Sequence, residues 1–344
     1  MQEKNLIIAI DDVEPGLVAA TKKLSKTLGR ELRGLVVADL NYPSIRERSQ
    51  DTSGLFEEII CDLDDHDSLQ KALKPHMDSL LAVSIRNESS VPALRKLVPF
   101  LPYVPTPSES SLLWSTEKHL MRDRLRSYDS SLVPQYCYLT ESNPAIIKDI
   151  VRKQSFPMIV KPNGLACSLL VVRCNNEAEL TRCLNQTFQV INDIYSRDLG
   201  RGTPSVLVEE MIQGDMYSTD AYVNADGKVY CLPLVKVITA ESLGLPGFYS
   251  YRHIIPTGLP KAEIEAAQAA SVSAIRALNL SSTTAHIELF HSPEGWKIIE
   301  LGPRIGGYRE GLYRESYGID HYYNDLAVKV GLEPDIPEEP IGHA

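Results

Sequence analysis

The stretch from Thr284 to Gly307 limits the possible folds of this chain most, because two runs with strand character flank a turn within it. The runs are residues 286–292 and 296–301, and the tripeptide 293–295, Pro-Glu-Gly, lies between them. The proline presets φ for the first turn position, and the glycine can adopt the left-handed conformation that closes a bulged loop. The stretch therefore predicts a β-hairpin with a three-residue loop.

Counting back from such a loop places Glu288 directly opposite Glu300 on one face of the hairpin. Like charges in that position destabilise a strand pair by roughly 0.2–1 kcal/mol, and a divalent cation would reverse the sign. Arg304 and a Gly-Gly turn follow, so the set suits magnesium-bound phosphate. A four-residue loop would instead turn the two carboxylates to opposite faces, and two solvent-facing glutamates are the ordinary alternative.

Composition excludes several classes of protein. A chain of 344 residues suggests two or three packed units, and a net charge of -10 disfavours a nucleic-acid-binding surface. No apolar run is long enough to cross a membrane, and the N-terminus leads straight into a strand-like run. We therefore expect a cytoplasmic protein with neither nucleic acid nor membrane as a partner. No cysteine forms a Cys-x-x-Cys pair, which favours free thiols over a zinc site: Cys61, Cys137, Cys167, Cys174, Cys183 and Cys231.

Residues 1 to about 100 alternate strand and helix patterns. The continuous apolar run Leu6–Ile10 is typical of a buried parallel strand, so this part is predicted to be a doubly wound α/β unit. Acidic residues, Asp11, Asp12 and Glu14, follow that strand where a dinucleotide-binding fold has glycines. They would repel a pyrophosphate, which disfavours a nicotinamide dehydrogenase. The proline-rich passage 99–107 predicts a linker.

Two further units follow, over residues 133–211 and 217–332. In the first, Lys161 ends an apolar strand and meets a loop of small residues that contains Ser168. A lysine followed by loop amides and a hydroxyl suits bound phosphates, although an ordinary hairpin is equally consistent. In the second, an amphipathic helix is predicted over 262–278, a final helix over 319–330, and a loop over 241–252.

Together these features resemble the ATP-grasp superfamily of carboxylate ligases. The resemblance covers roughly residues 1 to 332 and rests on five features in order. They are Thr116-Glu117-Lys118, the strand Met158–Pro162, the small-residue loop 165–172, the segment Val208–Gly214, and the Glu288–Glu300 hairpin with Gly302-Pro303-Arg304. The implied fold is α/β (α+β), an ATP-grasp fold behind an N-terminal doubly wound domain. Its implied parts are a Rossmann-like domain over 1–105, a small lobe over 106–210, and a large lobe over 211–344 that carries the metal hairpin.

The resemblance also implies roles at matching positions. Lys118 and Lys161 would neutralise the phosphates of ATP, and Ser168 belongs to the phosphate loop. Glu209 would accept from the adenine amino group, while the backbone around Met211 pairs with the ring edge. The remaining nucleotide contacts would come from Glu210, Ile212 and Asp215. Glu288 and Glu300 would hold Mg²⁺, with Mn²⁺ as the alternative cation, and Arg304 would stabilise the transferring phosphoryl group.

The implied reaction joins a carboxylate to an amine, both small molecules, through an acyl phosphate. Arg309 is the predicted substrate carboxylate anchor, with Arg252 and His253 as further substrate contacts. The sequence departs from the family where Met216 replaces a ribose-binding glutamate and Gly302 replaces an asparagine ligand, which leaves open whether one or two cations bind. L-amino-acid-ligase-like members also lack that asparagine, and such ligases are often homodimers. The alternatives are another ATP-grasp activity, of purine-pathway or carboxylase type, and a catalytically inactive nucleotide-binding regulator.

Overall fold

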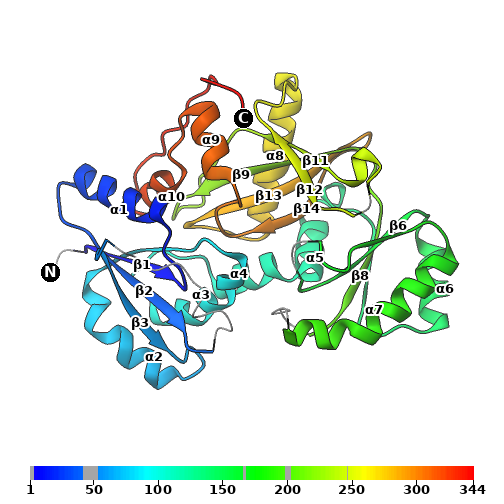
Figure 1. Ribbon diagram of the computed structural model, residues 1–344, viewed down its shortest axis with the longest axis horizontal. Coiled ribbons are helices and arrows are strands. Elements are labelled where there is room, and N and C mark those ends of the chain that lie inside the picture. The colour runs from blue at the N-terminus through cyan, green and yellow to red at the C-terminus, as the bar shows by residue number, and fades with distance from the viewer. Residues whose placement is uncertain (1–3, 42–52, 166–167, 198–202, 246) are drawn as a thin grey trace.

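The protein is described by a computed structural model that covers residues 4–41, 53–165, 168–245 (apart from 198–202) and 247–344. Three sheets organise these residues, in the order of the chain. Figure 1 shows the N-terminal sheet at one end, the second sheet with α6 and α7 at the other, and the largest sheet between them.

The N-terminal sheet is four-stranded and parallel, with the order β3-β2-β1-β4. Its strands are β1 (Leu6–Ile10), β2 (Arg33–Asp39), β3 (Phe56–Cys61) and β4 (Leu80–Ser84), and its helices are α1 (Pro15–Leu28), α2 (His66–Leu73) and α3 (Val91–Leu97). Every residue of β1 is buried, as expected for a central parallel strand covered on both faces. The predicted doubly wound unit is therefore confirmed.

Helices α4 (Glu109–Thr116) and α5 (Lys118–Tyr128) connect this unit to a four-stranded antiparallel sheet. That sheet has the order β5-β8-β6-β7, from β5 (Tyr136–Leu139), β8 (Val206–Glu210), β6 (Met158–Pro162) and β7 (Val172–Cys174). Helices α6 (Pro144–Lys153) and α7 (Glu177–Arg197) pack with it. Lys161 lies in β6 and Glu209 in the neighbouring strand β8, so the predicted lysine strand and the strand that precedes Gly214 are hydrogen-bonded partners.

The third sheet follows the order β12-β11-β9-β13-β14, and β10 also pairs with β9. Its strands are β9 (Asp215–Val223), β10 (Val229–Cys231), β11 (Val235–Thr239), β12 (Ser250–Ile254), β13 (Thr283–Ser292) and β14 (Gly295–Gly302). Helix α8 (Lys261–Ala277) packs its alanines against one face, where Tyr217, Ile287 and Leu301 form part of a buried cluster. Because side chains alternate along a strand, Ser218, Glu288 and Glu300 must lie on the opposite face.

The β13–β14 hairpin confirms the predicted carboxylate pair and corrects the turn. Glu288 faces Glu300 as expected. The predicted three-residue loop is wrong, because Ser292 pairs with Gly295 and the loop has two residues. That shorter loop alone would put the glutamates out of phase, since the regular pairing continues as far as Leu289 with Ile298. A β-bulge at Ile299 restores the phase and brings Glu288 opposite Glu300.

The C-terminal helices are α9 (Arg309–Tyr317) and α10 (His321–Lys329). The sequence predicted only the second, although Gly318 between them adopts the left-handed conformation that ends many helices. Helix α10 packs on α1, and Tyr322 and Leu326 share one core cluster with Ile7 of β1. The N-terminal unit therefore buries part of its apolar surface against the C-terminal part of the chain. No helix among the described residues is both long enough and apolar enough to span a bilayer.

Candidate functional site

A cavity of about 380 Å³ lies where the second sheet meets the face of the third sheet that points away from α8. It brings together ten of the residues singled out in the sequence: Lys118, Lys161, Ser168, Glu209, Glu210, Met211, Ile212, Asp215, Glu288 and Glu300. Apolar side chains, among them Ile159, Met216 and Phe290, complete its lining. Arg252, His253, Arg304 and Arg309 do not line this cavity.

Two buried lysines are paired with carboxylates at the cavity wall. The Lys118 ammonium lies 3.2 Å from Glu300 Oε1 and donates to the carbonyl of Leu165 at 2.8 Å. The Lys161 ammonium lies 2.6 Å from Glu209 Oε2. Burial lowers the pKa of Lys161 to about 8, although the Glu209 carboxylate acts in the opposite direction. The two lysines therefore line one cavity, and each is paired with a protein carboxylate there.

Glu209 has a second partner that the sequence analysis did not identify. Arg122 is fully buried and donates from Nε to Glu209 Oε1 at 2.8 Å. Burial acts to raise the pKa of the Glu209 carboxyl, but the charges of Arg122 and Lys161 prevail and lower it. Contact of Glu209 with an adenine amino group stays a prediction, and the structure gives this carboxylate an additional role as the counter-ion of two cations.

The segment around Met211 follows β8 along one side of the cavity. The N–H of Met211 donates to the carbonyl of Pro157 at 3.1 Å, so this amide is not available to a purine ring. A backbone contact to a ring edge would have to use the carbonyl of Met211 or the neighbouring residues. Asp215 is exposed and pairs with Lys236 at 2.7 Å. Ser168 adopts a left-handed backbone conformation, and the preceding residues 166–167 of the predicted phosphate loop lie outside the described part.

Glu288 and Glu300 form an oxygen-rich pair at the cavity. Directly opposed side chains in an antiparallel pair have Cβ atoms roughly 4.5–5.5 Å apart, a spacing that one cation can bridge. Within the described residues, no three His, Cys, Asp or Glu side chains are grouped so that they could hold a metal. Mg²⁺ commonly takes only one or two carboxylates and fills its remaining positions with phosphate oxygens and water, so two facing carboxylates are compatible with it.

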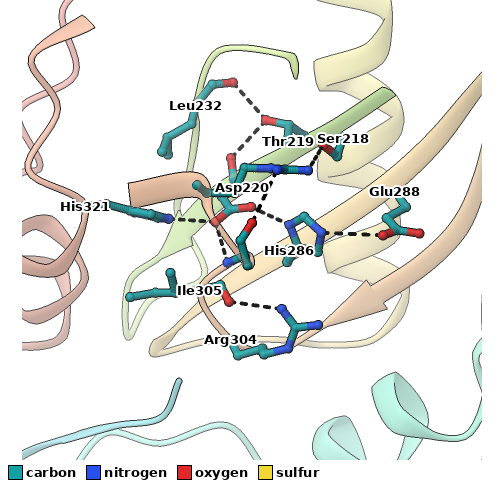
Figure 2. A network of polar contacts seen from close by, with 12 residues as sticks. Ser218, Thr219, Asp220, Leu232, His286, Glu288, Arg304, Ile305 and His321 are labelled. Atoms are coloured by element: carbon teal, nitrogen blue, oxygen red, sulfur yellow. Dashed lines mark hydrogen bonds and ion pairs between the residues drawn. The ribbon is translucent and has the colours of Figure 1, made fainter. Parts of the chain in front are cut away.

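A buried polar network adjoins this pair (Figure 2). Asp220 Oδ1 lies 2.6 Å from His286 Nδ1, and Asp220 Oδ2 lies 2.6 Å from His321 Nε2. Burial would raise the pKa of the Asp220 carboxyl, but the two imidazoles hold it well below its usual range. The other ring nitrogen of His286 faces Glu288 Oε1 at 3.7 Å. The network thus connects α10 to the candidate metal pair.

Asp220 also holds the Gly-Gly turn that precedes α9. The N–H of Gly306 donates to Asp220 Oδ2 at 2.8 Å. A Cβ at Gly306 would lie 2.4 Å from His286 Nδ1 and 2.7 Å from Asp220 Oδ1, so only glycine fits. His286 lies two residues before Glu288 on the same strand face, which is a signal that the sequence contained. Asp220 carried no such signal, because its partners come from β13, α10 and the turn.

Arg304 contacts the N-terminal unit. Its Nε donates to Glu88 Oε2 at 2.7 Å, and its Nη1 donates to the carbonyl of Ile305. A Cβ at Gly302 would lie 2.5 Å from the same Glu88 oxygen. The departure from the family pattern at Gly302 therefore has a packing reason, since the Glu88 carboxylate fills the space of a side chain there. A role for Arg304 on a phosphoryl group stays a prediction.

Arg309 begins α9 and is only 3% exposed. Its Nη2 donates to Ser218 Oγ at 2.5 Å and its Nη1 to the carbonyl of Gly307, while its Nε has no hydrogen-bond partner among the described residues. His253, half-buried, has its pKa lowered to about 4 by burial and by the charge of Arg309. It is therefore neutral near pH 7. Arg252 is exposed and points to the other face of β12.

Comparisons with known proteins agree with this geometry. A family model described as an ATP-grasp domain matches residues 154–310, a range that contains β6, β8, the β13–β14 hairpin and Arg304. This match identifies an ATP-grasp domain within the chain. The chain is 35% identical over 235 residues to carnosine synthase 1 of Mus musculus, a match that covers 65% of this chain and 27% of that protein. The chain thus spans about a quarter of the length of this relative.

Solved structures of other ATP-grasp proteins share the fold. The L-amino acid ligase of Bacillus licheniformis superposes with a TM-score of 0.77 at 19% identity, over 100% of this chain and 80% of that one. N5-carboxyaminoimidazole synthetase from Staphylococcus aureus, solved with ADP, gives 0.71 at 16% identity, over 98% and 80%. The ATP-grasp fold expected from the sequence is therefore confirmed.

Proposed function

We propose that this chain is an ATP-dependent ligase that joins a carboxylic acid to an amine through an acyl phosphate. The observation that carries the proposal is the facing pair Glu288 and Glu300 on the wall that also presents Lys118 and Lys161. Two opposed carboxylates beside two lysines suit a magnesium nucleotide better than any neutral ligand. Two of the similar proteins are named carnosine synthase and L-amino acid ligase, and these names support an acid and an amine as the substrates.

The chain's own residues would act as follows. Lys118 and Lys161 would exchange Glu300 and Glu209 for phosphate oxygens, while Glu288 and Glu300 hold Mg²⁺. Bound Mg²⁺ would neutralise the charge that develops on the phosphates. A substrate carboxylate oxygen then attacks the γ-phosphorus, and the bond to the bridging oxygen of ADP breaks. The amine nitrogen next attacks the acyl carbon, the bond to phosphate breaks, and the amine loses a proton.

Arg309 supports a carboxylate as the substrate. A buried guanidinium that makes no ion pair among the described residues carries a desolvation cost that an anion would offset. Ser218, which binds Arg309, is the register partner of Glu288, so an anion held there would lie beside the proposed cation.

Phosphate release tests the proposal. Wild-type protein and the variant Glu300→Ala are assayed with ATP and Mg²⁺ against pools of amino acids and small carboxylic acids. Release that needs both a pool and Glu300 establishes the ligase, and dividing the active pool identifies the acid. Binding of ATP without release in any pool would favour a nucleotide-binding regulator, and failure to bind ATP would contradict the proposal.

A further inference from the structure

Arg122 lies on one of three elements that meet at the cavity and contacts the other two. It lies on α5, one helical turn after Lys118, and none of its surface is exposed. Its Nε donates to Glu209 on β8 at 2.8 Å. Its Nη2 donates to the backbone carbonyl of Ile299 on β14 at 2.7 Å. One guanidinium therefore connects α5, on which it lies, with β8 and with the β13–β14 hairpin.

The contact with Ile299 falls on the residue that sets the phase of the hairpin. Between the two-residue loop and Ile298, the strands pair regularly, and an unbroken pairing would place Glu288 opposite Ile299. The bulge makes Glu300 the partner of Glu288 instead. A bulge leaves one residue outside the regular ladder, so its backbone groups need other partners. Arg122 supplies a charged donor for the carbonyl of Ile299.

The contact with Arg122 gives the Glu209 carboxylate a second cationic partner besides Lys161. Lys161 stands 2.6 Å from the same carboxylate and is proposed to turn to phosphate when a nucleotide binds. Without a second cation, that exchange would leave Glu209 buried and unpaired, at high cost. Arg122 does not line the cavity, and its bonds to Glu209 leave that carboxylate neutralised while Lys161 moves.

We propose that Arg122 is a positioning residue. Through its hydrogen bond to the bulge residue Ile299, it keeps Glu300 directly opposite Glu288, where the two carboxylates could hold a cation. Through Glu209, Arg122 also links the β13–β14 hairpin to β8, which lines the cavity proposed to bind the nucleotide. The inference rests on the proposed function, because it assigns the cation to Glu288 and Glu300. It predicts that Arg122 governs affinity for the cation more than affinity for the nucleotide.

The conservative variant Arg122→Lys separates the two contacts. A lysine keeps the positive charge beside Glu209 but lacks the planar fork that reaches Glu209 and Ile299 together. Outer contacts of this kind typically change metal affinity by about 10-fold to 100-fold. We therefore expect Arg122→Lys to raise the Mn²⁺ dissociation constant about tenfold, measured by electron paramagnetic resonance with ADP present. The dissociation constant of ADP without metal should stay within about twofold, since Glu209 remains paired.

Arg126, one turn further along α5, is the matched control. It is exposed and pairs with Asp123, so Arg126→Lys should leave both constants unchanged. Unchanged Mn²⁺ affinity in Arg122→Lys, while Glu300→Gln abolishes Mn²⁺ binding, would overturn the inference and leave the proposed function intact. Mn²⁺ binding that Glu300→Gln does not weaken would overturn the proposed function itself. An equal loss of Mn²⁺ and ADP affinity in Arg122→Lys would also overturn the inference, since it would indicate a general structural role.

Discussion

At the scale of the residue, Lys161 shows how burial changes the pKa of a lysine at the cavity. An ammonium that is surrounded by protein loses its proton more readily than one in water, and Glu209 only partly compensates. The sequence identified Lys161 because it ends an apolar strand before a loop of small residues. It could not identify the change in pKa, since Arg122 and Glu209 come from two other elements.

If Lys161 binds phosphate as proposed, its lowered pKa predicts that nucleotide binding depends on pH. Phosphate binds the protonated ammonium, so the affinity for ADP should be constant below pH 8 and fall as Lys161 loses its proton. Above that pH, each further unit should weaken binding by up to about tenfold, until the pKa of the bound state is reached. Calorimetric titration of ADP without metal, from about pH 7 to pH 10, measures this. Lys161→Arg keeps its charge throughout, so a decline of the same steepness in that variant would assign the effect elsewhere.

At the scale of the element, the β13–β14 hairpin shows what can and what cannot be predicted from the sequence. That Glu288 and Glu300 lie on the two strands of one hairpin was predictable, because two strand-like runs flank a turn tripeptide. The turn itself was not, since loops of two and three residues suit Pro-Glu-Gly about equally well. The carbonyl of the bulge residue Ile299 accepts a hydrogen bond from Arg122, which lies far away in the sequence. The predicted pairing of Glu288 with Glu300 is correct because the bulge, which was not predicted, offsets the error of one residue in the loop length.

The Asp220 network joins β9, β13 and α10, so we expect it to stabilise the fold. Replacing Asp220 with Asn removes the charge between two imidazoles and should cost about 3–5 kcal/mol in the free energy of unfolding. Asp226→Asn, in an exposed turn, is the control and should have little effect. Urea denaturation followed by circular dichroism measures both. A difference below about 1 kcal/mol would show that Asp220 is dispensable for stability.

The same difference should depend on pH. The pKa of Asp220 is lowered on folding, so its contribution is present above the unfolded value near pH 4 and is lost as the pH falls. The charge of Asp220 raises the pKa of His286 despite burial, so that contribution is present below about pH 6.5 and is lost as the pH rises through the folded value. The gap between wild type and Asp220→Asn should therefore be largest between about pH 4 and pH 6.5.

At the scale of the whole molecule, the two ends of the chain form one packed unit. Arg86, just after β4, donates to the hydroxyl of Tyr322 on α10 at 2.9 Å and to the carbonyl of Ile305 at 3.3 Å. Glu88 reaches Arg304 from the same segment. A sequence pattern identifies a doubly wound unit but not what covers its edges, because that depends on partners some 200 residues away. The division of the chain at residue 105 stays a prediction, since one core cluster crosses it.

This contact can be tested at Gly302. A methyl group there would meet Glu88 Oε2 and push it away from Arg304, which should cost about 1–3 kcal/mol in stability and reduce turnover. Gly302→Ala is compared with Gly311→Ala, where nothing lies within 4 Å of the added Cβ. Thermal unfolding and phosphate release measure the two effects. Wild-type behaviour of Gly302→Ala would show that the Glu88–Arg304 pair does not matter to the site.

The transfer of oxygen from acid to phosphate tests the central claim most directly. The acid identified in the active pool is labelled with ¹⁸O in its carboxyl group, and the phosphate released with ATP, Mg²⁺ and the amine is analysed by mass spectrometry. Attack of the carboxylate on the γ-phosphorus predicts one labelled oxygen in each phosphate, with ADP as the other nucleotide product. Unlabelled phosphate, or release of AMP and pyrophosphate, would contradict activation of the acid as an acyl phosphate.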